Sequence, residues 1–343
     1  MNPIMHSIIL MSVATGTIIT MSSFHWLMAW IGLELNTLAI IPLISKQHHP
    51  RATEATTKYF LTQAAASAMI LFASTINAWT TGTWDISQLT DKSSCILLTA
   101  GLSMKLGLAP LHFWLPEVMQ GIPVTTALIV ATWQKLAPMT LLFMNHNSIN
   151  PTILLMMGML STFTGGWAGL NQTQTRKILA FSSIAHLGWM VSILTINPNL
   201  LLLNLTLYIL MTTPTFLMLN LTSSKTIKDL STMGNTSPHM PILLMILLMS
   251  LGGLPPLTGF MPKWLILQEL TTHNLPTTAT ILALSTLISL FFYLRLAYVS
   301  TLTAHPTTTK TPHKWRFQPK PSTTPITTLT LLSMTLLPMT PLL

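Results

Sequence analysis

The sequence predicts an all-α polytopic membrane protein of about eleven transmembrane helices, with two inverted repeats that each contain a discontinuous helix. Three observations predict this class. Of the 343 residues 50% are hydrophobic and only 7% are charged, whereas a soluble domain carries roughly 25% charged residues. Apolar stretches of about 20 residues, the length that crosses a bilayer core, recur along the chain. One motif that combines glycine and proline occurs twice.

The apolar stretches define the spans in chain order. The first lacks the basic segment and the small-residue cleavage site of a signal peptide, so we expect it to be retained as a span. Two later spans, the fourth and the ninth, are overlong and contain prolines, which break helical hydrogen bonding. We treat each as one discontinuous helix, a form that membranes tolerate where it lines a polar cavity. The expected spans are 3–21, 24–45, 57–80, 93–120, 123–144, 151–170, 176–196, 199–222, 240–270, 275–303 and 322–342.

Charges in the loops indicate an orientation. With these spans, the loops on one side and the helix ends beside them hold eleven lysines and arginines, whereas the other side holds Lys92 alone. This asymmetry predicts an N-terminus on the inner side and a C-terminus on the outer side. The net charge of +9 is then explained by topology and by attraction to anionic lipids, so we do not expect a nucleic-acid partner.

The repeated motif lies in the two discontinuous helices. Residues 107–117 read GLAPLHFWLPE and residues 253–263 read GLPPLTGFMPK, with five identities at an offset of 146 residues. The second copy lies five spans after the first, an odd number, so the two should cross the membrane in opposite directions. Interrupted helices in inverted repeats predict a transport site near the bilayer midplane. The alternative is a chance likeness between two helices that kink only for packing.

Five charged residues fall well inside the expected spans, where a charge costs about 2.5–3.5 kcal/mol on insertion scales. They are Glu34 in the second span, Lys105 and Glu117 on either side of the first break, Lys135 in the fifth span and Lys263 at the second break. Burial disfavours the charged form of a lysine, whereas a neighbouring carboxylate favours it. A lysine under both influences can load and release a proton. The alternative is a structural ion pair between Glu34 and one lysine.

Three further residues are more ambiguous. His112 and His186 either take part in proton transfer or are hydrogen-bonded core histidines. Arg295 lies near the end of its span, and its long side chain can reach the interface.

The sequence has no cysteine cluster for iron–sulfur binding and no glycine-rich nucleotide fingerprint. The single cysteine also excludes a disulfide framework within the chain and a multi-cysteine zinc site, so we expect no cofactor or metal in this chain.

Five segments together resemble a known family over the whole chain. They are WIGLELNTLAIIPL around Glu34, MKLGLAPLHFWLPEV around Lys105, TWQKLAP around Lys135, SSIAHLGWM around His186 and GLPPLTGFMPKW around Lys263. The chain resembles the mitochondrially encoded chain 2 family of NADH:ubiquinone oxidoreductase (respiratory complex I), in its shortened animal form. These antiporter-like membrane subunits are similar to subunits of bacterial cation/proton antiporters.

The resemblance implies a role for each matched residue. Glu34 and Lys105 would form the glutamate–lysine pair of the N-terminal half-channel, Lys135 would be the connecting lysine, and Lys263 the terminal lysine of the other half-channel. His112, His186 and Glu117 would be additional candidates for the relay. The chain would then be a core membrane subunit of a translocase, contributing to proton translocation driven by redox chemistry in other subunits. NADH, FMN, iron–sulfur clusters and ubiquinone would all belong to those other parts of the complex.

The resemblance also implies a location and partners. We expect a multi-pass protein of the mitochondrial inner membrane, with its N-terminus in the matrix and its C-terminus in the intermembrane space. Its partners would be other membrane and accessory subunits of complex I and lipids such as cardiolipin. Residues 1–343 would form a single antiporter-like domain, comprising a shortened N-terminal half (1–144), a second half (151–303) and a basic loop with a final helix (304–343). The alternatives are a structural or assembly subunit with a vestigial channel, and a cation/proton antiporter subunit.

Overall fold

The structure is a computed structural model that describes residues 3–47, 49–235, 239–303 and 324–338. Within these ranges the chain is helical, apart from turns, linkers and two isolated β-bridges, so the predicted all-α class is confirmed. The helices are α1 (Pro3–Ser22), α2 (Trp26–Ile44), α3 (Pro50–Thr81), α4 (Lys92–Leu106), α5 (Trp114–Gly121), α6 (Val124–Ala131), α7 (Leu136–Met144), α8 (Pro151–Gly169), α9 (Thr175–Ile193), α10 (Pro198–Leu221), α11 (Ile227–Ser231), α12 (His239–Gly252), α13 (Phe260–Thr272), α14 (Pro276–Thr301) and α15 (Thr324–Thr335). Three short 3₁₀ helices are η1 (Ser45–Gln47), η2 (Trp133–Lys135) and η3 (Met233–Asn235).

A helix or a pair of helices lies at the position of each expected span. Among the described residues, six helical segments are long and apolar enough to cross a membrane: α1, α2, α3, the α6–α7 segment, α10 and α14. This identifies a multi-pass membrane protein. The last span is described only in part, as α15, and the expected basic loop 304–321 lies outside the described residues.

One expected boundary is wrong by several residues. α3 begins at Pro50 rather than near residue 57. His49 caps this helix, because its Nδ1 accepts a hydrogen bond from the Arg51 amide, and Pro50 occupies a first-turn position that needs no amide donor. The prediction from hydrophobicity located only the start of the apolar part of α3. It did not include the polar turns that precede this part.

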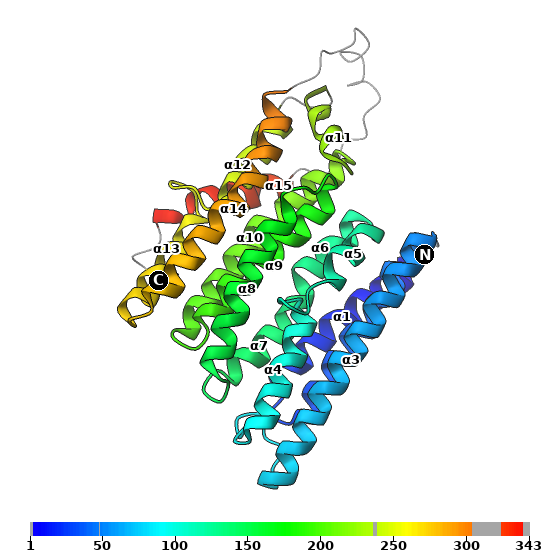
Figure 1. Cartoon of the computed structure of the whole chain (residues 1–343). Helices are drawn as coiled ribbons and strands as arrows, with labels where there is room; N and C mark the ends of the chain where they lie inside the picture. The colour runs from blue at the N-terminus through cyan, green and yellow to red at the C-terminus, as the bar shows by residue number, and fades with distance from the viewer. Residues whose placement is uncertain (1–2, 48, 236–238, 304–323, 339–343) are drawn as a thin grey trace. The chain divides into compact units, whose positions relative to one another are not determined.

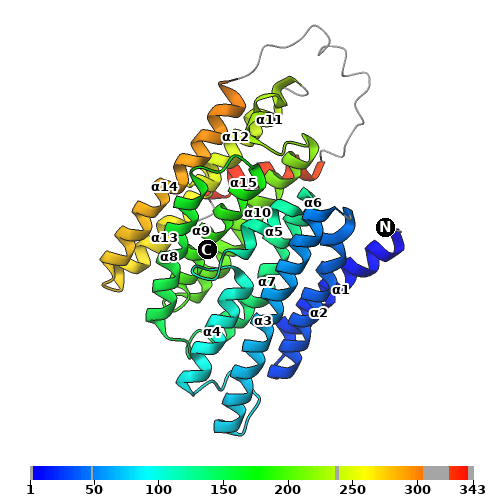
Figure 2. The same cartoon turned by 45° about the vertical axis from the view of Figure 1, so that its right-hand side comes forward.

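The chain divides into two compact units, residues 1–161 and 162–343. In the first unit α3 packs against α2, α4 and α5, and α1 lies along α2, as Figure 2 shows in blue to cyan. The α1–α2 contact is close, because a Cβ placed on Gly32 would lie only 2.8 Å from the Gly16 carbonyl oxygen. Small residues at such a crossing let two membrane helices approach closely.

In the second unit α9 is buried along its length from Ile178 to Ile193. It contacts α10, α13 and α14, and α12 packs along α14 (Figure 1). This arrangement places the second copy of the repeated motif, between α12 and α13, beside the buried helix.

The first break separates α4 from α5. α4 ends at Leu106, and Gly107 follows in the left-handed conformation with a φ of +78°. Glycine adopts this conformation without the steric cost that a Cβ imposes. The indole nitrogen of Trp114, the first residue of α5, donates to the Met104 carbonyl oxygen at 2.9 Å and so satisfies one carbonyl at the end of α4.

The second break separates α12 from α13 and has the same form. α12 ends at Gly252, Gly253 has a φ of +77°, and α13 begins at Phe260. Leu106, Gly107 and Trp114 hold the same three positions in the first break. The peptide bonds preceding Pro110 and Pro256 are both cis. Both spans that the sequence predicts to be discontinuous are therefore interrupted.

A third interruption was not expected. The fifth span is divided into α6 and α7 by η2. Pro138 explains the break, because it has no amide to donate to the Gln134 carbonyl four residues earlier and its ring crowds that carbonyl. Lys135 is consequently the last residue of a 3₁₀ turn rather than part of a continuous α-helix.

Candidate functional site

The expected lysines share one structural feature: each lies at a helix interruption. Lys105 is in the last turn of α4, Lys135 ends η2, and Lys263 is in the first turns of α13. Helix ends present backbone groups that have no partner within the helix. A break can therefore supply a polar partner to a lysine inside an otherwise apolar segment.

Burial distinguishes the site residues from ordinary surface charges. Lys105, Lys135, His112 and His186 are between 4% and 7% exposed. Glu34 and Lys263 are half-buried. A buried cation is costly unless its surroundings stabilise it, so the contacts of each group determine what it can do.

A small polar cavity lies in the first unit at the meeting of α2, α3, α4 and the η2 break. Its volume is about 10 Å³, close to the roughly 10–15 Å³ that one water molecule needs. Lys105 is the only charged residue that lines it. The complete lining is Leu33, Asn36, Thr37, Gln63, Lys105, Gln134 and Pro138.

Glu34 and Lys105 are close enough to interact electrostatically but are not in contact. Among the described residues no ion pair within 4.0 Å joins them. Glu34 Oε2 and Lys105 Nζ are both buried and have no hydrogen-bonding partner among those residues. The interaction between Glu34 and Lys105 is therefore a Coulomb attraction across a gap. Its strength depends on the side chains or water that fill this gap.

Three uncharged side chains form a hydrogen-bonded chain beside this pair. The Tyr59 hydroxyl donates to Gln134 Oε1 at 3.4 Å, and Gln134 Nε2 donates to Asn36 Oδ1 at 2.7 Å. The sequence-based prediction did not include these residues, because it was confined to charged residues and histidines. A signal was present: Asn36 follows Glu34 by two residues, and Gln134 directly precedes Lys135, both within apolar stretches.

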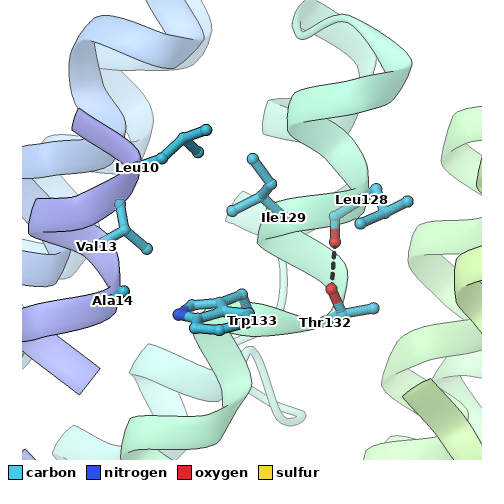
Figure 3. Close-up of a pocket in the computed structure, with 7 residues that line it drawn as sticks. All are labelled: Leu10, Val13, Ala14, Leu128, Ile129, Thr132 and Trp133. Atoms are coloured by element: carbon cyan, nitrogen blue, oxygen red, sulfur yellow. Dashed lines mark hydrogen bonds between the residues drawn. The ribbon is translucent and has the colours of Figure 1, made fainter. Parts of the chain in front are cut away.

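An apolar pocket of about 210 Å³ lies on another side of the η2 break, between α1 and α6 (Figure 3). Leu10 and Val13 reach it from α1, and Trp133 forms its floor in this view. Its one hydroxyl, on Thr132, donates to the Leu128 carbonyl at 2.8 Å. This pocket is largely apolar, and consecutive residues of η2 face different environments: Trp133 the apolar pocket and Gln134 the polar cavity.

The first break places its two remaining candidates in different surroundings. His112 is buried in the linker between α4 and α5, with its ring centroid 4.3 Å from that of Phe113. Its Nδ1 has no hydrogen-bonding partner in the part of the chain that the structure describes. Glu117 is exposed and forms an ion pair with Lys58 at 2.7 Å. Lys58 also pairs with Glu54, one turn earlier on α3.

The second break holds Lys263 directly. Its Nζ donates to the Gly252 carbonyl oxygen at 2.7 Å, so a cation caps the C-terminal end of α12, where the helix dipole favours positive charge. Gly253 leaves room for this arrangement, because a Cβ there would lie 2.8 Å from Lys263 Cδ and from Nζ. Glycine at 253 therefore suits the left-handed conformation and leaves the lysine side chain its present course, which a Cβ would force it to change.

Two other polar residues of the second unit contact neighbouring helices. His186 on α9 lies beside Tyr208 on α10, with ring centroids 5.5 Å apart. Arg295 on α14 donates from a guanidinium nitrogen to the Leu170 carbonyl at 2.8 Å, just after the end of α8. Arg295 thus stabilises a helix end, which the sequence did not predict. Within the described ranges, no group of three or more histidine, cysteine, aspartate or glutamate residues could hold a metal ion.

Comparisons with known proteins define the class. Residues 23–289 match the sequence model described as "NADH:quinone oxidoreductase/Mrp antiporter, TM", and residues 290–343 match "NADH dehydrogenase subunit 2 C-terminus". A chain of respiratory complex I from Thermus thermophilus is similar in structure, with a TM-score of 0.87 and 28% identity over 97% of this chain and 78% of that one. A chain of the Mrp complex from Dietzia sp. shares the fold, with a TM-score of 0.86 and 15% identity over 97% of this chain and 75% of that one. The chain is an antiporter-like membrane protein.

Relatives of similar length define the family within that class. NADH-ubiquinone oxidoreductase chain 2 of Varanus timorensis is 59% identical over 342 residues, which cover 100% of this chain and 99% of the relative. The protein of the same name from Salmo salar is 57% identical over 341 residues, covering 99% and 98%. The chain belongs to the NADH-ubiquinone oxidoreductase chain 2 family.

Proposed function

We propose that this chain is a core membrane subunit of NADH:ubiquinone oxidoreductase that contributes to proton translocation across the mitochondrial inner membrane. The observation that carries the proposal is the placement of Lys105, Lys135 and Lys263, each at a helix interruption within membrane segments. The redox chemistry and its cofactors (NADH, FMN, iron–sulfur clusters and ubiquinone) belong to other subunits of the complex. Those subunits are the partners of this chain.

The relay works by electrostatic coupling between buried charges. A change in the distance or protonation of Glu34 alters the cost of charge on Lys105, and the effect passes to Lys135 and then to Lys263. Unit charges several ångströms apart interact by a few kcal/mol at an effective dielectric constant of about 20, and about 1.4 kcal/mol changes a protonation equilibrium tenfold. The missing contact between Glu34 and Lys105 suits this role, because a tight ion pair would hold both charges fixed.

The remaining candidates differ in how well their surroundings suit proton transfer. His112 is buried in the linker of the first break, and His186 is buried on α9. Both are our candidates for additional proton carriers. The exposed ion pair with Lys58 favours a structural role for Glu117.

The membrane architecture is part of the same proposal. We propose eleven spans in two inverted repeats, with the N-terminus in the matrix and the C-terminus in the intermembrane space. The matching positions of the two left-handed glycines and of the helix ends beside them support the repeat. The excess of lysine and arginine on one side supports the orientation and provides sites for anionic lipids such as cardiolipin.

Substitution of Lys135 tests the function. In the assembled complex reconstituted into vesicles, we expect Lys135→Met to lower NADH-driven proton uptake at least about tenfold, since the relay loses its connecting group. Lys92→Met is the matched control, because Lys92 is an exposed residue at the start of α4, and it should pump normally. A normal ratio of protons to NADH in Lys135→Met would refute the relay.

A structural role is the second candidate function. The contacts of Lys263 with Gly252 and of Arg295 with Leu170 favour it, because both cations hold helix ends in place. In that case Lys135→Met and Lys263→Met would reduce the amount of assembled complex but leave the protons moved per NADH unchanged.

A further inference from the structure

The hydrogen-bonded chain of Tyr59, Gln134 and Asn36 has a direction. Tyr59 donates to the oxygen end of the Gln134 amide, and the nitrogen end of that amide donates to Asn36 Oδ1. In this orientation both ends of the Gln134 amide are engaged. The Asn36 oxygen then faces Gln134, and its nitrogen lies on the other side of the planar group.

The chain ends at a cavity that contains two unsatisfied donors. Asn36 and Lys105 both line the polar cavity. Asn36 Nδ2 and Lys105 Nζ are buried, and neither nitrogen has a hydrogen-bonding partner among the residues that the structure describes. A buried donor without a partner costs about 1–3 kcal/mol, more when it is charged. Two such donors in one cavity indicate an occupant that accepts hydrogen bonds.

Size and chemistry restrict what that occupant can be. The volume of about 10 Å³ corresponds to one molecule of the size of water. Water accepts two hydrogen bonds, one from each nitrogen, and keeps two O–H groups to donate. Gln63, which lines the same cavity, carries an amide oxygen that can accept one of them.

We propose that the cavity is a single-water site between Lys105 Nζ and Asn36 Nδ2, and that Gln134 is the positioning residue that maintains it by orienting the Asn36 amide. Gln134 does not need to touch the water. It belongs to η2, next to Lys135, so it links the segment that carries Lys135 to the surroundings of Lys105. When Lys105 is charged, the water accepts a hydrogen bond from its ammonium group; when Lys105 is neutral, the water can turn and donate to the amine nitrogen.

The first test concerns the site itself. Gln134→Met preserves the approximate side-chain length but removes both the donor and the acceptor. Maps of the whole complex at a resolution that shows ordered waters should contain one water within hydrogen-bonding distance of both nitrogens. In the Gln134→Met complex this water should be lost or displaced. Its absence from the unmodified complex, or its persistence in the variant, would overturn the proposal.

The second test concerns pumping and rests on the proposed function. We expect Gln134→Met and Asn36→Leu each to lower NADH-driven proton uptake about tenfold, as the loss of a buried hydrogen bond can. The double variant should be no worse than Asn36→Leu alone, because Gln134 acts through Asn36. Additive losses would contradict this order. Trp133→Phe is the control, because Trp133 belongs to the same 3₁₀ turn but faces the apolar pocket. An equal loss of proton uptake in this variant would mean that the effect comes from disturbing the helix break and not from the water site.

A pair of exchanged side chains separates positioning from bulk structure. Gln134→Asn shortens the reach by one methylene group and should impair pumping, whereas adding Asn36→Gln restores the combined length and should rescue it. Lys135→Met separates this inference from the proposed function. If Lys135→Met stops pumping and Gln134→Met changes neither water nor pumping, only the inference fails. If Lys135→Met pumps normally and Gln134→Met still loses the water, the water site stands and the relay fails.

Discussion

Alanine at Gly253 should weaken the second helix break more than alanine at Gly107 weakens the first. Both glycines are left-handed, with φ values of +77° and +78°, so both substitutions cost about 1–2 kcal/mol in backbone conformation. At 253 the new Cβ would also lie 2.8 Å from Lys263 Nζ and Cδ, so the lysine side chain must shift, and we expect it to leave the Gly252 carbonyl. That lost bond from a charged donor costs about 1.5–3 kcal/mol more.

The two positions form a matched pair. A Cβ on Gly107 would meet its nearest neighbour, the Leu115 side chain, at 3.5 Å, an ordinary contact. Gly107→Ala therefore carries only the backbone cost. The difference between the variants isolates the contribution of Lys263 to the break, and by the factor of ten per about 1.4 kcal/mol it corresponds to a roughly ten- to hundredfold difference in local opening.

Amide hydrogen exchange in the assembled complex measures this opening. The Leu254 amide bonds to the Met249 carbonyl at 3.3 Å, and the Leu108 amide bonds to the Ser103 carbonyl at 3.0 Å. We expect exchange at Leu108 to accelerate roughly 5- to 30-fold in Gly107→Ala. Exchange at Leu254 in Gly253→Ala should accelerate by a further factor of roughly ten to a hundred. Equal acceleration at the two breaks would show that Lys263 does not support the second one.

Two further predictions concern the acidic residues Glu117 and Asp229. Glu117→Gln removes one of the two carboxylate partners of Lys58 and leaves Glu54. Because both side chains are exposed, we expect stability to change by no more than about 1 kcal/mol and proton uptake to stay normal; a loss of pumping would restore Glu117 to the relay. Asp229 caps α11 by accepting from the Lys225 and Thr226 amides at 3.0 and 2.8 Å. Although its partial burial acts to raise the pKa, these hydrogen bonds outweigh it and lower the Asp229 pKa. The cap therefore contributes stability above the unfolded-state pKa and is lost as pH falls through the folded-state pKa. Exchange of these two amides, corrected for intrinsic rates, should accelerate in that acidic range. In Asp229→Asn, whose side-chain oxygen still accepts but does not titrate, this pH dependence should disappear; a wild-type profile in the variant would contradict the role of the carboxylate.

The sequence was sufficient to predict the two motif-bearing breaks and the burial of Lys105, but not the exposure of Glu117. Glycine followed by prolines gives a strong local signal, because it acts on the backbone of its own segment. Charges are equally conspicuous, since they are rare and costly in apolar stretches. The break at η2 was harder to predict. Pro138 was visible, but a proline in a membrane helix can kink it without producing a 3₁₀ turn.

Contacts between side chains could not be predicted in the same way. Whether Glu34 touches Lys105, or Lys263 reaches Gly252, depends on how far two helices are rotated and shifted against each other. Glu117 illustrates the difficulty: its partner, Lys58, lies far away in sequence on α3. Uncharged polar residues such as Gln134 give still weaker signals, because a lone amide in an apolar stretch is often only a packing or hydrogen-bonding residue.

The hydrogen bond from Lys263 to the carbonyl of Gly252 joins an ionisable group to the junction of two helices. The attraction between a cation and a helix C-terminus is worth about 0.3–1 kcal/mol at the surface and up to about 2 kcal/mol when partly buried. Linkage makes this attraction act both ways. A force that pulls α12 and α13 apart makes it easier for the lysine to give up its proton, and departure of the proton makes the junction easier to open by the same free energy. At the second break, deprotonation of Lys263 and displacement of the helices are thus coupled, so that energy supplied to one process can drive the other.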